Sequence, residues 1–468
     1  MKILFVSSEV VPFAKTGGLA DVAGALPKAL KELGHDIRLF MPRYKKIEAA
    51  NFGLKKVSEE IWEGKIPGSD VVIYFYENEK YFGGREELYQ VKGVDYEDNL
   101  ERFAAFCQAT LRLPKALNWT PEIIHCNDWQ SALIAAYVKL GSEPIYSRIG
   151  VVYSIHNMGY LGLFPKEKMP ATGLGWDQFS TDKLEFWGKI ALSKAGFIYA
   201  DVINTVSQTY AKEIQTEEYG HGLDGLIRHR SRDVYGIVNG LDYDVWNPAT
   251  DKNIPQRYST ISLLGKAANK AALQKQNNLP QKKETPVIGM ITRLADQKGL
   301  DILAGALDEI MKLKCQFIVL GTGDPQYHEL LTRAKQKYPD YIGANLKFDA
   351  MQAQLIYAGS DMFLMPSRYE PCGLGQLISF KYGTIPIVRK TGGLADTVHN
   401  FISKTGEGDG FVFQEYSSAA LLDAVKRAMA AYKKKTLWKK LVEKVMDYDY
   451  SWGTSAKHYQ ELYARARK

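Results

Sequence analysis

Cysteine is scarce in this sequence. The four cysteines, Cys107, Cys126, Cys315 and Cys372, form no Cys-x-x-Cys pair and have no partners at the spacing of zinc ligands. A disulfide-stapled fold and a cysteine-based zinc site are therefore not expected. Scattered single cysteines are typical of a protein that works in a reducing compartment.

Long hydrophobic runs are also missing. No uninterrupted apolar stretch approaches the ~20 residues that a helix needs to cross a bilayer. The apolar run at residues 3–6 is too short for the core of a signal peptide, and Glu9 and Pro12 interrupt its continuation. We therefore expect no membrane partner, and we expect the protein to be cytoplasmic.

The sequence has no strong excess of charge of one sign. It contains 60 Lys and Arg against 53 Asp and Glu, a formal net charge of +7. No stretch combines clustered basic residues with interleaved aromatics, so nucleic acid is not an expected partner. The mild positive excess suits an anionic small substrate, and an ordinary protein surface explains it equally well.

Alternating strand-like and helix-like segments run through most of the chain. A chain of 468 residues is long for a single hydrophobic core, so we expect at least two domains. Short apolar segments typical of strands alternate with segments of helical periodicity in two separate stretches. This pattern predicts an α/β fold with two Rossmann-like domains. The expected strands are 3–6, 37–40, 71–75, 123–126, 151–155 and 202–206 in the first stretch, and 287–292, 316–320, 346–348, 362–365 and 385–388 in the second.

A seven-residue segment occurs twice. Lys-Thr-Gly-Gly-Leu-Ala-Asp stands at 15–21 and again at 390–396, each time between an expected strand and an expected helix. Glycines at a helix start let backbone N–H groups approach an anion, and the helix dipole favours negative charge there. The repeat therefore predicts phosphate or sugar loops. A shared turn geometry with no ligand at either copy is the alternative interpretation.

Six short motifs stand in a fixed order from one end of the chain to the other. Their order and composition resemble the bacterial glycogen synthase and plant starch synthase family, and the resemblance covers essentially the whole sequence. The motifs are Lys-Thr-Gly-Gly-Leu at 15–19, His-Cys-Asn-Asp-Trp at 125–129, Ser-Ile-His-Asn at 154–157, Asn-Gly-Leu-Asp at 239–242, Arg-Leu-Ala-Asp-Gln-Lys-Gly at 293–299 and Glu-Pro-Cys-Gly-Leu at 370–374.

The resemblance implies a retaining glycosyltransferase of the GT-B fold, with two Rossmann-like domains facing each other across a deep cleft. It implies ADP-glucose as donor, an α-1,4-glucan such as glycogen or starch as acceptor, and no cofactor. We expect residues 1–240 to form the acceptor-side domain and residues 241–449 the donor-side domain. Residues 450–468 are expected to form a helix that packs back on the first domain.

Glucosyl transfer needs cations near the leaving diphosphate, because negative charge builds there in a loose transition state. Arg293 and Lys298, five positions apart after an expected strand, fit this role. The resemblance places Glu370 against the donor glucose, and backbone N–H groups of Gly373 and Leu374 toward the phosphates. Related glucosyltransferases carry a second glutamate eight positions after the first, where this sequence has Ile378.

Asp128 and His156 follow two separate expected strands of the first domain. The resemblance implies that they hold glucose hydroxyls from opposite sides of the crevice. Trp129 and Tyr96 are candidate sugar or acceptor contacts. The remaining candidates for donor binding are Lys15, Gly17, Gly18, Asp21, Asn157, Asn239, Gln297 and Cys372.

No metal site is expected. The Asp-x-Asp pattern at 242–244 is a weak match that recurs at 447–449, and it lies inside a segment that resembles the family's interdomain loop. Two other functions stay open: a sucrose- or trehalose-phosphate synthase of the same fold, and a degenerate homologue that only binds glucan. The presence of Lys15, Asp128, Arg293, Lys298 and Glu370 argues against the second.

Overall fold

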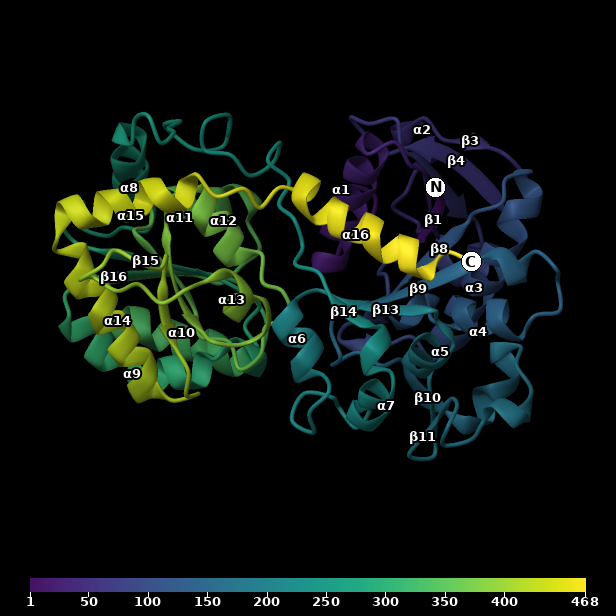
Figure 1. Cartoon of the computed structure of the whole chain (residues 1–468). Coiled ribbons are helices and arrows are strands. Elements are labelled where there is room, and N and C mark those ends of the chain that lie inside the picture. The colour runs from purple at the N-terminus through teal and green to yellow at the C-terminus, as the bar shows by residue number, and fades with distance from the viewer. The chain divides into compact units, whose positions relative to one another are not determined.

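The computed structural model describes all 468 residues, which form two units. One unit consists of Met1–Gly240 together with Trp452–Lys468, and the other of Leu241–Ser451 (Figure 1). No helix has the length and the apolar character needed to cross a membrane.

The Leu241–Ser451 unit is built on a six-stranded parallel sheet. In chain order the strands are β15 (Val287–Ile291), β16 (Gln316–Leu320), β17 (Ile342–Asn345), β18 (Met362–Met365), β19 (Ile385–Arg389) and β20 (Phe411–Phe413). Their spatial order is β17-β16-β15-β18-β19-β20, and every pair is parallel. This is the 3-2-1-4-5-6 order of a doubly wound Rossmann sheet.

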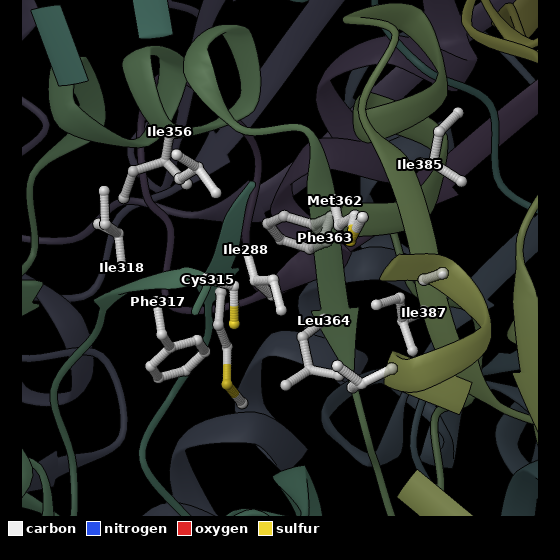
Figure 2. Close-up of a cluster of buried hydrophobic side chains, with 14 of the residues drawn as sticks. Ile288, Cys315, Phe317, Ile318, Ile356, Met362, Phe363, Leu364, Ile385 and Ile387 are labelled. Carbon is white, nitrogen blue, oxygen red and sulfur yellow. The ribbon is translucent and has the colours of Figure 1, made fainter. Parts of the chain in front are cut away.

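Helices cover both faces of this sheet (Figure 1). Their apolar residues recur at three- and four-residue spacing, as in Leu300, Leu303, Leu307 and Ile310 of α9, and these side chains are buried. Figure 2 shows part of the resulting core, where strand residues meet Ile356 of α11. The helices are α8 (Leu264–Gln276), α9 (Leu300–Lys312), α10 (Pro325–Lys337), α11 (Ala350–Gly359), α12 (Gly375–Lys381), α13 (Gly392–Thr397), α14 (Ser418–Tyr432) and α15 (Lys435–Met446).

Two parts of this unit differ from the sequence-based expectation. The strand expected at 346–348 is wrong, because β17 ends at Asn345 and Phe348 is exposed. Pairing with β16 sets this strand at Ile342–Asn345, whose Gly and Ala residues have weak strand propensity. Helix α8 lies in the segment between the two stretches, to which we assigned no helix.

The other unit contains a nine-stranded sheet in the order β14-β13-β9-β8-β1-β2-β5-β4-β3. The strands from β14 to β5 are parallel, and β4 and β3 extend the β5 edge in antiparallel pairing. All six strands expected in this half overlap strands of the sheet. The nine strands of the sheet are β1 (Lys2–Val6), β2 (Asp36–Pro42), β3 (Lys55–Lys56), β4 (Ile61–Lys65), β5 (Val72–Tyr76), β8 (Ile123–Asn127), β9 (Gly150–Ile155), β13 (Val202–Thr205) and β14 (Val234–Gly236).

Helices, a small three-stranded sheet and a two-stranded sheet of β6 (Gln90–Val91) and β7 (Val94–Asp95) complete this unit. The main helices are α1 (Gly18–Glu32), α3 (Asn99–Ala116), α4 (Leu133–Leu140), α5 (Leu192–Tyr199), α6 (Gln208–Glu213) and α7 (Asp224–His229). The small antiparallel sheet has the order β10-β12-β11, with β10 (Leu163–Pro165), β11 (Glu185–Phe186) and β12 (Lys189–Ala191).

The C-terminal helix α16 (Trp452–Ala466) belongs to the same unit as the N-terminus. It packs against α1 and β9, as Figure 1 shows. His125 Nδ1 lies 2.8 Å from the Tyr463 hydroxyl, and the Ser455 hydroxyl donates to the Val238 carbonyl at 2.8 Å. The last helix is therefore part of the layer of helices that covers the N-terminal sheet.

Candidate active site

Each of the two large sheets has a switch point, where the chain stops adding strands on one side of the first strand and begins adding them on the other. In the Leu241–Ser451 unit this point lies between β15 and β18, and in the N-terminal unit it lies between β1 and β8. Ligands of open α/β sheets bind beyond the carboxyl ends of the strands at such points. Four loops meet this criterion: 292–299, 366–374, 7–17 and 128–132. Most of the candidate residues lie on them.

In the Leu241–Ser451 unit, the two switch-point loops bring Lys298 and Glu370 together. The Lys298 Nζ lies 2.6 Å from Glu370 Oε2, and the Ser367 hydroxyl donates to the same oxygen at 2.9 Å. The Glu370 residue is only 7% exposed. A buried carboxylate with two donors has one fixed orientation, and the ion pair holds the cation beside it.

Gln297 joins the same two loops. Its Nε2 donates to the Tyr369 carbonyl at 3.2 Å, and its Oε1 accepts from Arg293 Nη2 at 3.2 Å. The Arg368 backbone N–H donates to the Gln297 carbonyl at 2.8 Å. Arg293 is exposed, so its guanidinium combines a defined position with access to an anion. Two cations and one carboxylate thus converge at the carboxyl end of β15.

The second copy of the repeat supports the Glu370 loop from behind. The Gly393 N–H lies 3.1 Å from the carbonyls of both Glu370 and Pro371. A Cβ at Gly393 would lie 1.9 Å from the Cys372 carbonyl oxygen, and a Cβ at Gly392 would lie 1.9 Å from the Glu370 carbonyl oxygen. The two glycines therefore let the second copy pack closely against the Glu370 loop, as the shared-turn interpretation of the repeat requires. A ligand at this copy stays a prediction.

The Glu370 loop leads into α12, which begins at Gly375. Cys372 is buried, and the Gln376 side chain donates to the carbonyls of Cys372 and Gly373 at 3.1 and 2.8 Å. These contacts fix the loop immediately before the helix start. Phosphate contacts from the Gly373 and Leu374 N–H groups remain a prediction.

In the N-terminal unit, Asp128 follows β8 with an unusual backbone conformation. Its φ is +56° and its ψ is −179°, a region that residues other than glycine rarely adopt. The carboxylate accepts a hydrogen bond from the His156 backbone N–H at 2.7 Å. Burial raises the pKa of Asp128 to about 7, and repulsion from Glu9 adds to the effect. Strain and a raised pKa at one strand end are typical of a functional site.

His156 lies beside Asp128 and not across from it. Strands β8 and β9 are adjacent and parallel, so their ends reach the same edge of the sheet. The expectation that the two residues act from opposite sides of a crevice is therefore wrong. Burial lowers the pKa of His156 to about 4, so its imidazole is neutral at physiological pH. The ring Nε2 lies 3.0 Å from Asn127 Oδ1, which can only accept, so Nε2 carries the proton.

The first copy of the repeat is organised by Glu9, a residue that the motif search missed. Glu9 is 4% exposed and accepts hydrogen bonds from the Thr16 N–H, the Thr16 hydroxyl at 2.6 Å, the Gly17 N–H at 3.2 Å and the Tyr89 hydroxyl at 2.7 Å. Two of the backbone donors that we assigned to an anion are therefore occupied by this carboxylate. The position of Glu9 after β1 is the signal that could have found it.

Lys15 and Asp21 stand at the two ends of the repeat and form an ion pair, with Lys15 Nζ 2.7 Å from Asp21 Oδ1. Both side chains are partly exposed. A Cβ built at Gly17 or Gly18 meets no atom within 4 Å. The first copy therefore leaves open space in front of its glycines, in contrast to the packed second copy.

Alanine substitutions should separate the two copies. Gly18→Ala should leave the free energy of unfolding unchanged or raise it by up to ~1 kcal/mol, because alanine is the better helix residue and meets no atom. Gly393→Ala should lower it by ~1–3 kcal/mol, because the methyl group must displace backbone. Urea unfolding of both variants measures this difference. Equal stability of the two variants would contradict the assignment of open and packed copies.

The other candidates have local partners of their own. The Asn157 side chain accepts from the Gly159 N–H at 2.8 Å, and the side-chain oxygen of Asn239 is buried without a hydrogen-bond partner. The Tyr96 ring lies 4.7 and 4.8 Å from the guanidinium groups of Arg85 and Arg102. The Trp129 ring packs edge-on against Phe103 at 5.1 Å. Packing thus positions both aromatic rings, and their contacts with sugar remain predictions.

The Asp-x-Asp segment forms a local turn. The Asp242 Oδ1 accepts from the Asp244 N–H at 2.9 Å, and the hydroxyl of Tyr243 between them donates to the Tyr448 carbonyl at 3.2 Å. These bonds fit a connecting loop, as we predicted for this segment.

Two protein-family models match the chain. Residues 2–229 match the starch synthase catalytic domain, and residues 272–445 match glycosyl transferases group 1. The glycogen synthase of Geotalea daltonii is 48% identical over 477 residues, covering 99% of this chain and 98% of the relative. The glycogen synthase of Thermotoga maritima is 49% identical over 486 residues, covering 100% of this chain and 99% of the relative.

Solved structures resemble the fold along the whole chain. The catalytic domain of starch synthase IV from Arabidopsis thaliana, bound to ADP and acarbose, has a TM-score of 0.90 and 34% identity, with 99% of both chains covered. The sucrose-phosphate synthase from Thermosynechococcus elongatus has a TM-score of 0.61 and 17% identity, covering 99% of this chain and 98% of the neighbour. The second likeness concerns the fold alone.

Proposed function

The chain belongs to the glycogen and starch synthase family of GT-B glycosyltransferases, and from this premise we propose the details of its reaction. Glucan synthesis is the shared activity of this family and of this chain. We propose that the donor is ADP-glucose, that the acceptor is the non-reducing end of an α-1,4-glucan, and that the anomeric configuration is retained. We propose the cytoplasm as its location.

The contact between Lys298 and Glu370 carries this proposal. It sets a cation and a carboxylate 2.6 Å apart at the switch point of a Rossmann sheet. In glucosyl transfer the leaving diphosphate gains negative charge while the sugar ring gains positive charge. Lys298, with Arg293 on the same loop, would stabilise the diphosphate, and Glu370 would stabilise the ring. The Lys298–Glu370 pair would thus stabilise both charges that develop as the bond between sugar and diphosphate breaks.

We propose that transfer needs no metal ion. Arg293 and Lys298 lie on one loop of the Leu241–Ser451 unit, and we propose that they and the N-terminal ends of the adjoining helices hold the phosphates. Lys15, in the first copy of the repeat, stays a candidate for donor binding. Arg293 suits a bidentate contact, and Lys298 supplies a point charge beside the sugar.

Asp128 and the neutral His156 are the sugar-binding residues that we propose in the N-terminal unit. Their hydrogen bond, and the one from His156 to Asn127, fix both side chains at the end of β8 and β9. A carboxylate and a neutral imidazole can each orient a sugar hydroxyl, and neither needs to accept a formal charge during binding. We propose that Asp128 and His156 bind sugar hydroxyls. Asn157 and Trp129, which follow them directly in sequence, are proposed as further sugar contacts.

The choice of donor tests the proposal. The ADP held by the starch synthase IV catalytic domain supports an adenine nucleotide as the donor of this chain too. We expect kcat/KM to be at least about tenfold higher with ADP-glucose than with UDP-glucose, a difference of ~1.4 kcal/mol. Initial rates with both donors and one glycogen preparation measure it. A tenfold preference for UDP-glucose would overturn the donor assignment and leave the transfer reaction in place.

A further inference from the structure

A tight hairpin of the small sheet carries an exposed tryptophan at its tip. Phe186 of β11 pairs with Lys189 of β12, so only Trp187 and Gly188 form the loop. Their φ values are +49° and +77°. A two-residue loop with two positive φ angles is a type I′ turn, for which Asn-Gly is the favoured sequence. A tryptophan in the first position is therefore unexpected on conformational grounds.

Packing does not account for the residue either. Trp187 is 83% exposed, so its indole contributes little to the core. Bulky side chains at positive φ are outliers, because the Cβ crowds the backbone. The position thus combines an unfavourable backbone conformation with an exposed apolar ring. Strained residues that the core does not need are candidates for a function.

The indole is nevertheless held firmly. It stacks on the ring of Phe186 with centroids 5.0 Å apart and an interplanar angle of 13°. The Gly222 backbone lies so close that a Cβ there would be 3.0 Å from the Phe186 ring and 3.4 Å from the indole. The Glu185 carboxylate accepts from the Gly188 N–H at 2.7 Å and braces the turn. One face of the indole is supported, and the ring is presented to solvent as a flat plate.

We propose that Trp187 is a docking plate for the α-glucan chain, outside the residues that carry out transfer. This inference rests on the proposed function, in which the acceptor is an α-1,4-glucan. The C–H face of a pyranose ring fits the face of an aromatic ring, and an indole adds a polar N–H at its edge. Lys189, which pairs with Phe186 at the base of the turn, is exposed and charged, so the plate borders a polar surface. Protein interfaces need a larger apolar area than one ring.

The small sheet connects this plate to the Asp128 and His156 region. At the far end of β12, the Leu192 and Ser193 N–H groups donate to the carbonyls of Gly162 and Leu161 at 3.0 and 3.1 Å. Gly162 in turn abuts the Trp129 ring. The three residues of β12 span roughly 10 Å at the usual rise per residue. A long glucan whose end reaches this loop can therefore also lie on Trp187, whereas a very short one cannot reach both.

The variant Trp187→Asn provides the test, because Asn is favoured in a type I′ turn and the protein should fold with an equal or higher Tm. We expect the KM for glycogen to rise about fivefold with little change in kcat, and retardation in glycogen-containing native gels to weaken. With maltose as acceptor, the KM should change less than about twofold, since a disaccharide is no longer than β12 and Trp187 lies beyond the end of that strand. Trp176→Asn is the matched control. Trp176 is 56% exposed but meets Phe179 edge-on, so it should behave as wild type.

Three outcomes would decide against the plate. If Trp187→Asn keeps wild-type glycogen KM and gel retardation while the wild type transfers glucose, the inference fails and the proposed function stands. If the variant changes molecular mass in light scattering without glycogen, the ring is a protein contact. Equal losses with maltose and glycogen would place Trp187 in the transfer site itself. If the wild type transfers no glucose, the proposed function fails, and gel retardation by glycogen still tests the plate.

Discussion

Replacing Glu370 by alanine should lower turnover by a factor on the order of 10²–10³, because it removes preorganised charge from the reacting centre. The carboxylate accepts from Lys298 and from Ser367, so the substitution also frees Lys298 to shift. Arg293→Ala should fall in the same range, since it removes a cation from the adjoining strand end. Turnover is measured with saturating ADP-glucose and glycogen, and far-ultraviolet circular dichroism checks the fold.

A surface glutamate provides the control for this prediction. Glu309 forms an ion pair of 2.5 Å with Lys312 on the exposed side of α9. Glu309→Ala removes the same kind of pair and should leave turnover within a factor of about two, as expected for an exposed ion pair. If Glu370→Ala or Arg293→Ala keeps more than about a third of wild-type turnover, the role assigned to that residue through charge stabilisation is wrong.

Asp128→Asn should reduce turnover about 10²-fold and at the same time stabilise the protein above pH 7. The asparagine oxygen can still accept from the His156 N–H, so the local geometry survives. The folded-state pKa of Asp128 is about 7, above the ordinary aspartate value of 3.8. Between these two values the native state binds more protons than the unfolded state, so the wild-type free energy of unfolding falls as pH rises.

The variant lacks this pH-dependent loss. We expect Asp128→Asn and wild type to unfold with similar free energy near pH 4, and the variant to be more stable by up to ~4 kcal/mol at pH 8. Wild-type turnover should decline as pH falls through about 7, because the carboxylate becomes protonated. His156, with a pKa of about 4, should contribute nothing in that range. Urea unfolding at both pH values tests the claim, and equal stability at pH 8 would contradict it.

Much of the fold could be predicted from hydrophobic periodicity. The buried strands of both sheets are short apolar runs with helices between them, and this alternation indicates parallel sheets. Candidate residues that directly follow strands, such as Asp128 and Arg293, come to the switch points because parallel strands end at one edge. Strand-end position and residue chemistry together therefore identified this part of the candidate site.

What sequence could not predict depends on contacts between distant segments. Glu9 binds the Thr16 and Gly17 N–H groups only because β1 and α1 meet at a tight loop. The two copies of the repeat are identical in sequence, but only the second has the Glu370–Cys372 backbone against its glycines. The Asp128–His156 contact follows from β8 and β9 being neighbours, which periodicity does not specify. The strand expected at 346–348 lies at Ile342–Asn345 instead, because pairing with β16 sets its position.

The central claim is glucosyl transfer from ADP-glucose to the end of an α-1,4-glucan with retention. The direct measurement incubates the wild-type chain with radiolabelled ADP-glucose and maltohexaose, separates the products, and digests them with β-amylase, which cleaves only α-1,4 bonds from the non-reducing end. We predict that the label enters maltoheptaose and longer chains and that β-amylase releases all of it as maltose. Label recovered as free glucose, or in a product that resists β-amylase, would contradict the claim.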